Sequence, residues 1–271
     1  MRENFIHLGI DIGASNTKVI ALDGQEQVTH RLLFAHTDTA MPIANRISAH
    51  LPLNQETVRS VAITGVGAYQ MPETLFGVPL TRVHEFQATG LGGTSLSGLS
   101  DTLVVSMGTG TSFVYAKDGA YRHIIGSGVG GGTLLGLSLG LGQDMTEIEP
   151  LAGLGNLSHV DLTIGEIAPD GHLGLAPDLT ASNFGSVKPH SAKADVALGT
   201  FNLVFQAIGT MSVLAAQVVG VQDVVVIGTL AESPFAAEMF ARFSKAYGIR
   251  FTIPQNAAFA TAYGAVLAME S

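Results

Sequence analysis

Runs of β-branched residues end repeatedly in short glycine clusters along this chain, and this pattern narrows the possible folds more than any other feature. The glycine-bearing segments are GIDIGAS, ITGVGAY, SMGTGTS, VVVIGTL and a fifth, GSGVGGGTLLGLSLGLG, that leads into a helix. Glycines that follow β-branched runs mark turns at strand ends. In layered α/β proteins, ligands bind near such strand ends. The pattern therefore predicts an α/β protein with a binding site built from several turns.

Composition limits the class of protein and its partners. Hydrophobic residues make up 46% and charged residues 13% of the 271 residues, which is typical of a globular chain with a buried core. The formal net charge of -9 argues against nonspecific binding to nucleic acid or an anionic membrane. The chain has no cysteine, which excludes disulfides, thiolate metal sites and a cysteine nucleophile. We expect a cytoplasmic protein, because the absence of cysteine is compatible with a reducing compartment.

One segment, TFNLVFQAIGTMSVLAAQVVG at residues 200–220, is long enough to span a membrane. Polar residues Asn202, Gln206 and Gln217 interrupt it, and a strand-like run follows at once. We therefore predict a buried core helix and no membrane partner. The N-terminal stretch has no long apolar run after its arginine, which argues against a secretory signal.

Hydrophobic periodicity and turn residues predict alternating strands and helices. In the first part of the chain we expect strands at 6–10, 18–22, 28–34 and 58–64, and helices at 41–51 and 85–91. In the second part we expect strands at 102–107, 111–116, 224–227 and 250–253, and helices at 133–141, 194–219, 235–247 and the C-terminal end. This alternation is typical of an α/β fold.

The stretch VSMGTGTSFV, residues 105–114, allows two interpretations. Glycine favours tight hairpin turns because it tolerates positive φ. Small residues also let backbone N–H groups reach an anion such as phosphate. The stretch does not decide between them by itself. The start of the chain, HLGIDIGASNTKVIAL, has a similar strand–turn–strand form, with Asp11 entering the turn and Lys18 on the second strand.

These two segments resemble the first and second phosphate-binding hairpins of the actin/hexokinase/Hsp70 superfamily. The resemblance implies a two-lobed, actin-like (ribonuclease H-like) ATPase fold with the nucleotide cleft between the lobes. The implied lobes are 1–95, with the first hairpin, and 96–255, with the second hairpin and the adenosine site, while the closing segment 256–271 packs on the first lobe. ATP and Mg²⁺ are the implied cofactors, with Asp11 holding the magnesium ion through water.

Six motifs narrow the resemblance to the type II pantothenate kinases, over about residues 8–267. In order, they are GIDIGASNTKV, VHEFQATGLG, VSMGTGTS, GSGVGGGTLLGL, DLTASNFG and NAAFATAYGAV. The resemblance implies ATP-dependent phosphorylation of pantothenate to 4′-phosphopantothenate, the first step of coenzyme A biosynthesis, by a homodimer. Two alternatives stay open: a kinase of the same fold for pantetheine or an N-acetylhexosamine, and a nucleotide-dependent ATPase switch.

Glu85 in EFQA matches the catalytic glutamate of the family's EFDA-like motif and is expected to accept a hydroxyl proton. An ordinary glutamate in a first helical turn is the alternative. His84 is left out, because adjacent residues on a regular element point to different sides. The resemblance further implies an ATP-binding set contributed by the hairpins, a helix start and a late strand. Its members are Asp11, Gly13, Ala14, Ser15, Asn16, Thr17, Lys18, Gly108, Thr109, Gly110, Thr111, Gly131, Gly132, Thr133, Leu134, Leu135 and Thr229.

The glycines at 130–132 precede a helix, where free N–H groups and the helix dipole favour anions. Close packing against a neighbour is the alternative explanation. The acceptor is expected to contact Ser112, Arg122 and His123. Family members usually have an arginine where this chain has His123, and a one-residue shift in a strand reverses the side-chain direction. Either a small bulge restores Arg122 to that place, or the acceptor site differs.

Overall fold

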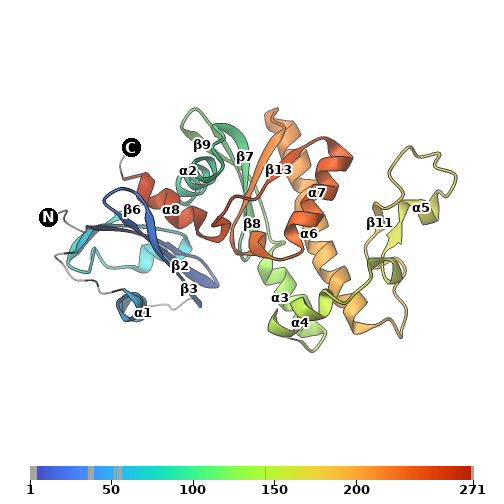
Figure 1. The fold of residues 1–271 in the computed structure, drawn as a ribbon, viewed down its shortest axis with the longest axis horizontal. Helices are drawn as coiled ribbons and strands as arrows, with labels where there is room; N and C mark the ends of the chain where they lie inside the picture. Colours follow the sequence, from blue (N-terminus) through green and yellow to red (C-terminus); the bar gives the residue numbers. More distant parts are fainter. Residues whose placement is uncertain (1–4, 36–39, 52, 54–56, 144, 270–271) are drawn as a thin grey trace.

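The computed structural model describes residues 5–35, 40–51, 53, 57–143 and 145–269, which form two lobes that each contain a β-sheet (Figure 1). The first sheet has the order β3-β2-β1-β4-β6-β5. Its first three strands form an antiparallel meander, and β4 and β6 extend it in parallel beside β1. The strands are β1 (Ile6–Ile12), β2 (Asn16–Asp23), β3 (Val28–Ala35), β4 (Val58–Thr64), β5 (Thr74–Leu75) and β6 (Val78–Arg82).

The second sheet, in the order β13-β12-β7-β8-β9, repeats this plan. Strands β7, β8 and β9 form the antiparallel meander, and β12 and β13 continue it in parallel beside β7. The strands are β7 (Asp101–Met107), β8 (Thr111–Lys117), β9 (Ala120–Ser127), β12 (Asp223–Ile227) and β13 (Arg250–Thr252). Each lobe therefore presents one β-hairpin, β1–β2 or β7–β8, next to a parallel strand of the same sheet.

The helices confirm the predicted α/β alternation, with small shifts at most boundaries. They are α1 (Ala40–His50), α2 (Glu85–Ser97), α3 (Gly131–Gly140), α4 (Met145–Ala152), α5 (Ile164–Ile167), α6 (Lys193–Val219), α7 (Ala236–Tyr247) and α8 (Ala260–Leu267). Short 3-10 helices are η1 (Val66–Gln70), η2 (Leu157–His159), η3 (Thr229–Glu232) and η4 (Ala257–Phe259). Helix α2 continues six residues beyond its predicted end. Strands β10 (Leu162–Thr163) and β11 (Thr180–Ser182) were not predicted, because two or three residues carry no periodic pattern.

Helix α6 is the one described helix that is long and apolar enough, by length and composition, to cross a membrane. Half of its most apolar window is buried in this structure, and its side chains Phe201, Phe205 and Ile208 are fully buried. They pack in the core of the second lobe with Phe113 of β8. Helix α6 is therefore apolar because its side chains pack in the core.

Helices α2 and α8 lie between the two sheets (Figure 1). Helix α8 packs on the first sheet, where a Cβ added at Gly9 would lie 2.1 Å from the Ala262 carbonyl oxygen. Helix α2 packs on the second sheet and crosses α8 at Gly92 and Gly264. The two backbones are in direct contact there, so these helices join the lobes. The proposed lobe limits stay a prediction, and residues 270 and 271 of the closing segment lie outside the described residues.

The segment between α4 and α6 extends away from the two sheets (Figure 1) and is fastened to α6 by Asp161. This carboxylate is buried, with 1% of the residue exposed. It accepts hydrogen bonds from the Phe184 backbone N–H at 2.8 Å and from Asn202 Nδ2 at 2.6 Å, while Asn183 Nδ2 is 3.4 Å away. The motif DLTASNFG therefore has a structural role in this chain.

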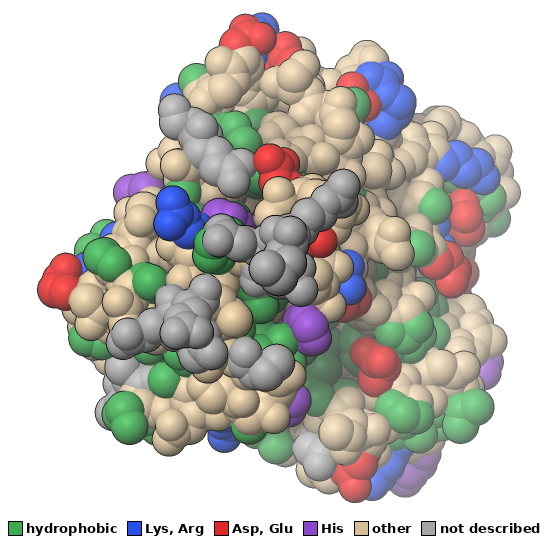
Figure 2. Space-filling model, turned by 60° about the vertical axis from the view of Figure 1, so that its left-hand side comes forward, with side chains coloured by type: hydrophobic (Ala, Val, Ile, Leu, Met, Phe, Trp, Pro, Cys, Tyr) green, Lys and Arg blue, Asp and Glu red, His purple; other side chains and the backbone are tan. Residues whose placement is uncertain are grey.

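The surface carries charges of both signs. On the face drawn in Figure 2, acidic, basic and histidine side chains are interspersed, and apolar side chains lie among them. Among the described residues, this face therefore shows no large patch of a single charge of the kind that attracts a polyanion.

Candidate active site

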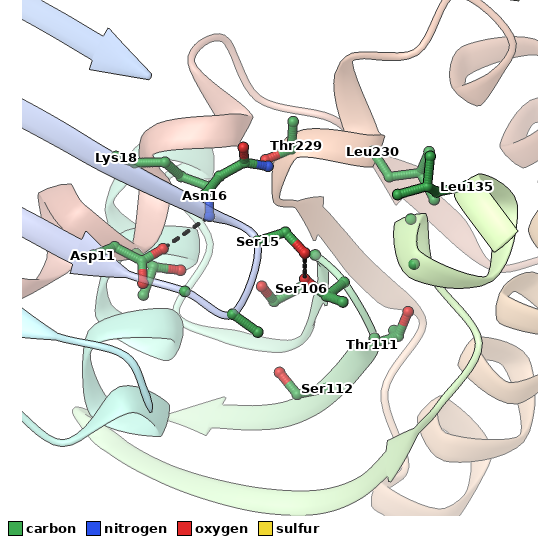
Figure 3. A pocket seen from close by; sticks show the side chains of 18 of the residues that line it. Asp11, Ser15, Asn16, Lys18, Ser106, Thr111, Ser112, Leu135, Thr229 and Leu230 are labelled. Carbon is green, nitrogen blue, oxygen red and sulfur yellow. Dashed lines mark hydrogen bonds and ion pairs between the residues drawn. The ribbon is translucent and has the colours of Figure 1, made fainter. Parts of the chain in front are cut away.

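A cleft of about 730 Å³ lies between the two lobes (Figure 3). Both hairpins line it, together with the first turns of α2 and α3, helix α4, η3 and one residue of α8. Most of the residues predicted to bind ATP or acceptor meet there: Asp11, Gly13, Ala14, Ser15, Asn16, Lys18, Glu85, Gly108, Thr109, Gly110, Thr111, Ser112, Gly131, Gly132, Leu135 and Thr229. Thr17 and Leu134 are fully buried, and they do not line the cleft; neither does Thr133.

Asp11 and Lys18 face each other across the first hairpin, at directly opposed positions of β1 and β2. Lys18 Nζ donates to Asp11 Oδ2 at 2.9 Å, and about a tenth of each side chain is exposed (Figure 3). Gly65, at the end of β4, has a φ of 89°, and a Cβ there would lie 2.7 Å from Asp11 Oδ1. Only glycine fits this position without strain, and the close approach fixes the place of the carboxylate.

The tips of the two hairpins touch. Ser15 Oγ and Thr109 Oγ1 form a hydrogen bond of 2.9 Å between residues of different lobes. The backbone N–H groups of Ala14, Ser15, Thr109 and Gly110 donate to no acceptor in the described parts of the chain. Backbone N–H groups without an acceptor at turns that line a cleft are suited to bind an anion. The stretch around Gly110 is thus a hairpin whose tip also fits a phosphate.

The sequence allowed positive φ as the reason for the hairpin glycines, but the structure does not show it. Neither Gly108 nor Gly110 adopts the left-handed region, and Ala14 does not either. Instead, Gly110 allows a close approach of two backbone segments, because a Cβ there would lie 2.8 Å from the Ser127 carbonyl oxygen. The missing side chain lets the tip of the second hairpin lie against the end of β9.

The expectation that the N–H groups at the start of α3 are free is wrong for all three glycines. The Gly130 N–H donates to Thr133 Oγ1 at 3.2 Å. The Gly131 N–H donates to the Gly108 carbonyl at 2.8 Å, and the Gly132 N–H donates to the Thr109 carbonyl at 2.8 Å. A Cβ at Gly130 would also lie 2.7 Å from the Thr109 carbonyl oxygen. Close packing, the alternative considered above, therefore explains these glycines. The start of α3 thus packs against the tip of the second hairpin through backbone hydrogen bonds.

Glu85 is the first residue of α2 and lines the cleft from the side of the first lobe. Burial raises the pKa of its carboxyl group above the usual value, and the negative charge of Asp11 adds to this effect. Lys18 and His84 act in the opposite direction and lower the pKa. A carboxylate whose pKa lies closer to neutrality is a better proton acceptor for an alcohol. The environment of Glu85 thus suits a general base.

Strand β9 places Arg122 and His123 on opposite faces of the second sheet. Arg122 is paired with Tyr115, and its guanidinium carbon lies 5.8 Å from the centre of that ring. His123 is paired with Val114 and stacks on Phe86 of α2, with the ring centroids 4.2 Å apart. A bulge is present in β9, but it follows both residues and does not turn Arg122 toward α2. The acceptor roles of these two residues stay predictions.

The cleft also contains residues that the sequence did not single out. They are Val66, Ser106, Gly126, Ser127, Met145, Glu149, Leu230, Glu232, Ser233 and Thr261. Most of them come from η3, α4 or the end of β9, which only the tertiary fold brings to the cleft. Figure 3 shows Leu135 and Leu230 at the opposite end of the cleft from Asp11. Apolar side chains at that end suit a purine base.

A second cavity of about 340 Å³ adjoins the cleft and shares Val66 and Glu85 with it. Its other lining residues are Gly65, Ala68, Tyr69, Arg82, Val83, His84 and Phe86. Glu85 therefore lies where two spaces meet, one beside the hairpins and one beside β6. This position lets one carboxylate contact molecules that enter from either side.

The hairpin geometry leads to a testable prediction for Gly110. Gly110→Val should raise the dissociation constant of a nonhydrolysable ATP analogue at least about 10-fold, because the new side chain clashes with Ser127 and moves the tip amides. Isothermal titration calorimetry measures this constant. Gly128→Val is the matched control, since a Cβ at Gly128 meets nothing within 4 Å. Unchanged affinity in a folded Gly110→Val variant would contradict the phosphate role of the tip.

Comparisons with known proteins agree with this geometry. The family model described as Fumble matches residues 95–248, which is more than half of the chain. A type II pantothenate kinase of Staphylococcus aureus (strain bovine RF122 / ET3-1) is 28% identical over 274 residues, covering 96% of this chain and 98% of that protein. One from Bacillus anthracis is 27% identical over 233 residues, covering 82% of each.

Solved structures share the fold at lower sequence identity. The activator of 2-hydroxyisocaproyl-CoA dehydratase from Clostridium difficile, solved with ADPNP, has a TM-score of 0.71 and 15% identity, covering 97% of this chain and 94% of that chain. A ROK family glucokinase from Streptomyces griseus, solved with glucose and AMPPNP, has a TM-score of 0.60 and 15% identity. The match covers 98% of this chain and 100% of that chain. The predicted two-lobed, actin-like ATPase fold is confirmed.

Proposed function

Because this chain belongs to the Fumble family of type II pantothenate kinases, we propose that its cleft holds ATP between the two hairpins and that Glu85 activates the acceptor alcohol. The reaction transfers the γ-phosphoryl group of ATP to the pantothenate hydroxyl and yields 4′-phosphopantothenate and ADP. One observation carries the residue assignment. Glu85, with a raised pKa, lines the same cleft as two hairpin tips with free backbone amides.

Each part of the site has a defined task in this reaction. The free amides of the two tips donate to phosphate oxygens and hold the chain of phosphates in place. Lys18 adds positive charge next to them. The acceptor oxygen forms a bond to the γ-phosphorus while the bond to the oxygen of ADP breaks, and Glu85 takes the proton of the acceptor hydroxyl.

The residues present fit a magnesium ion that is bound mainly by the nucleotide. No group of three His, Asp or Glu side chains that could hold a metal occurs in the described parts of the chain. Magnesium ions in kinase sites need only one or two carboxylates, together with phosphate oxygens and water. Asp11, fixed at the cleft wall by Lys18 and Gly65, is the carboxylate for this role. A bound Mg²⁺ neutralises negative charge on the phosphates.

Release of ADP distinguishes the proposed acceptor from its alternatives. The enzyme should release ADP rapidly with pantothenate, and much more slowly with N-acetylglucosamine or with no acceptor. Faster turnover with the amino sugar would assign the cleft to another kinase reaction of the same fold. Equal turnover without any acceptor would favour the nucleotide-dependent switch.

We propose that His123, rather than Arg122, contacts the acceptor. Neither residue lines the cleft, but a Cβ at the cleft residue Gly126 would lie 3.7 Å from His123 Nε2, which supports the choice of His123. We expect His123→Ala to raise the KM for pantothenate about 10-fold, because a hydrogen bond to the carboxylate is lost. Arg122→Ala should stay within about two-fold of wild type.

A second acceptor completes this test. Pantetheine has an amide in place of the carboxylate, so its KM should respond weakly to His123→Ala. A large effect of Arg122→Ala would reverse the assignment.

We also propose that the protein is a cytoplasmic homodimer with only small-molecule substrates as partners. Leu135, Leu137, Leu139 and Leu141 of the α3 region are each at least 38% exposed, which offers an apolar surface for a second copy. The net charge of -9 and the interspersed charges of Figure 2 argue against nucleic acid as a partner. Light scattering after size-exclusion chromatography should give a mass near twice 28.1 kDa, and a monomer mass would reject the dimer.

A further inference from the structure

His84 immediately precedes Glu85, and its ring caps the helix that Glu85 begins. The backbone of His84 is extended, with φ -61° and ψ 133°, as is usual for a residue at this position. The Phe86 backbone N–H donates to His84 Nδ1 at 3.3 Å. The imidazole of His84 therefore caps the first turn of α2, which carries Glu85.

A second contact holds the same turn against the other lobe. Phe86 lies between two imidazole rings: its centroid is 5.3 Å from that of His84 and 4.2 Å from that of His123. The planes of Phe86 and His123 differ by 12°, which is a stacked arrangement. His123 belongs to β9 of the second sheet. The residues on either side of Glu85 thus each make one of these contacts: His84 caps α2, and Phe86 stacks on His123 of β9.

We propose that His84 is a positioning residue for the kinase reaction, which caps α2 and so keeps the Glu85 carboxylate at the junction of the two cavities. This inference rests on the proposed function of Glu85. His84 and Glu85 both line the second cavity, but only Glu85 also lines the cleft beside the hairpins. His84 therefore acts through the helix start, and its loss should affect the rate of phosphoryl transfer more than the binding of ATP.

The test compares His84→Ala with His84→Asn at pH 8. Alanine removes the cap, and we expect kcat to fall about five-fold while the KM for ATP stays within about two-fold. Asparagine is among the preferred capping residues, and we expect it to keep kcat within about two-fold of wild type. Melting temperatures of all variants show that they are folded. Asn156→Ala, which removes the cap of η2 at a residue that lines neither cavity, should leave kcat unchanged.

Three results would overturn the proposal. They are a wild-type kcat in His84→Ala, a kcat in His84→Asn as low as in His84→Ala, and an equal loss in Asn156→Ala. Glu85→Gln is measured in the same series. If Glu85→Gln keeps its turnover, the proposed role of Glu85 has failed; if only the His84 variants behave unexpectedly, the failure is confined to the positioning role.

Discussion

Replacing Glu85 with glutamine should reduce turnover at least about 100-fold and leave the affinity for ATP within about two-fold of wild type. Glutamine keeps the volume of the side chain but cannot accept the hydroxyl proton. Steady-state ADP release gives the turnover, and calorimetric titration with an ATP analogue gives the affinity. Glu149→Gln makes the same change elsewhere in the cleft and should lower kcat less than about three-fold. Turnover near the wild-type value in Glu85→Gln would remove this residue from the chemistry.

The raised pKa of Glu85 adds a second expected result. Burial and Asp11 favour the protonated form, so the native state binds this proton more tightly than the unfolded chain does. The contribution of Glu85 to stability is therefore lost as the pH rises from its unfolded pKa through its raised folded pKa. Above that window the buried charge is a cost, and Glu85→Gln should be at least as stable as wild type at pH 8. Activity should fall as the pH falls through the same raised pKa.

Gly264→Ala should destabilise the protein by about 3 kcal/mol or more, because the crossing of α2 and α8 has no room for a methyl group. The added Cβ would lie 2.0 Å from the Ala88 carbonyl oxygen and 2.5 Å from the Gly92 nitrogen. Both contacts are with backbone, so no side chain can rotate away and the helices must separate. Because these helices join the lobes, the separation should also displace Glu85 and lower turnover. Urea denaturation measures the free energy of unfolding.

Gly136→Ala is the matched control for that substitution. Gly136 also lies within a helix, α3, but a Cβ there meets nothing within 4 Å. Alanine should stabilise the helix by about 0.5–1 kcal/mol relative to glycine. A similar loss of stability in both variants would show that helix propensity, and not the crossing of α2 and α8, decides the effect. A stable, fully active Gly264→Ala variant would contradict the close packing.

Local patterns in the sequence predicted most of the fold because each sheet is built from strand–turn–strand units with clear ends. Asp11 and Lys18 were singled out separately, since each flanks the turn of the first hairpin, and the structure pairs them. Glu85 was singled out by the resemblance of EFQA to a family motif at the start of a predicted helix. These features depend on residues that are near each other in the chain, and sequence patterns report such relations well.

Contacts between segments that are distant in the chain could not be predicted from these local patterns. The sequence predicted free amides at Gly131 and Gly132, but their acceptors are in a hairpin more than twenty residues away in the chain. The hydrogen bond between Ser15 and Thr109 joins residues 94 positions apart. His84 was set aside because neighbours on a helix point apart, and that argument does not consider a side chain that caps its own helix. Tertiary packing decided the first two cases, and a local cap decided the third.

Identification of the product tests the central claim most directly. Purified protein is incubated with ATP, Mg²⁺ and pantothenate, and the mixture is followed by ³¹P nuclear magnetic resonance and mass spectrometry. We predict one new phosphate monoester per ADP formed, with the mass of 4′-phosphopantothenate, and at least about a 100-fold slower appearance with Glu85→Gln. ADP accompanied only by inorganic phosphate, or no phosphorylated pantothenate at all, would contradict the assignment.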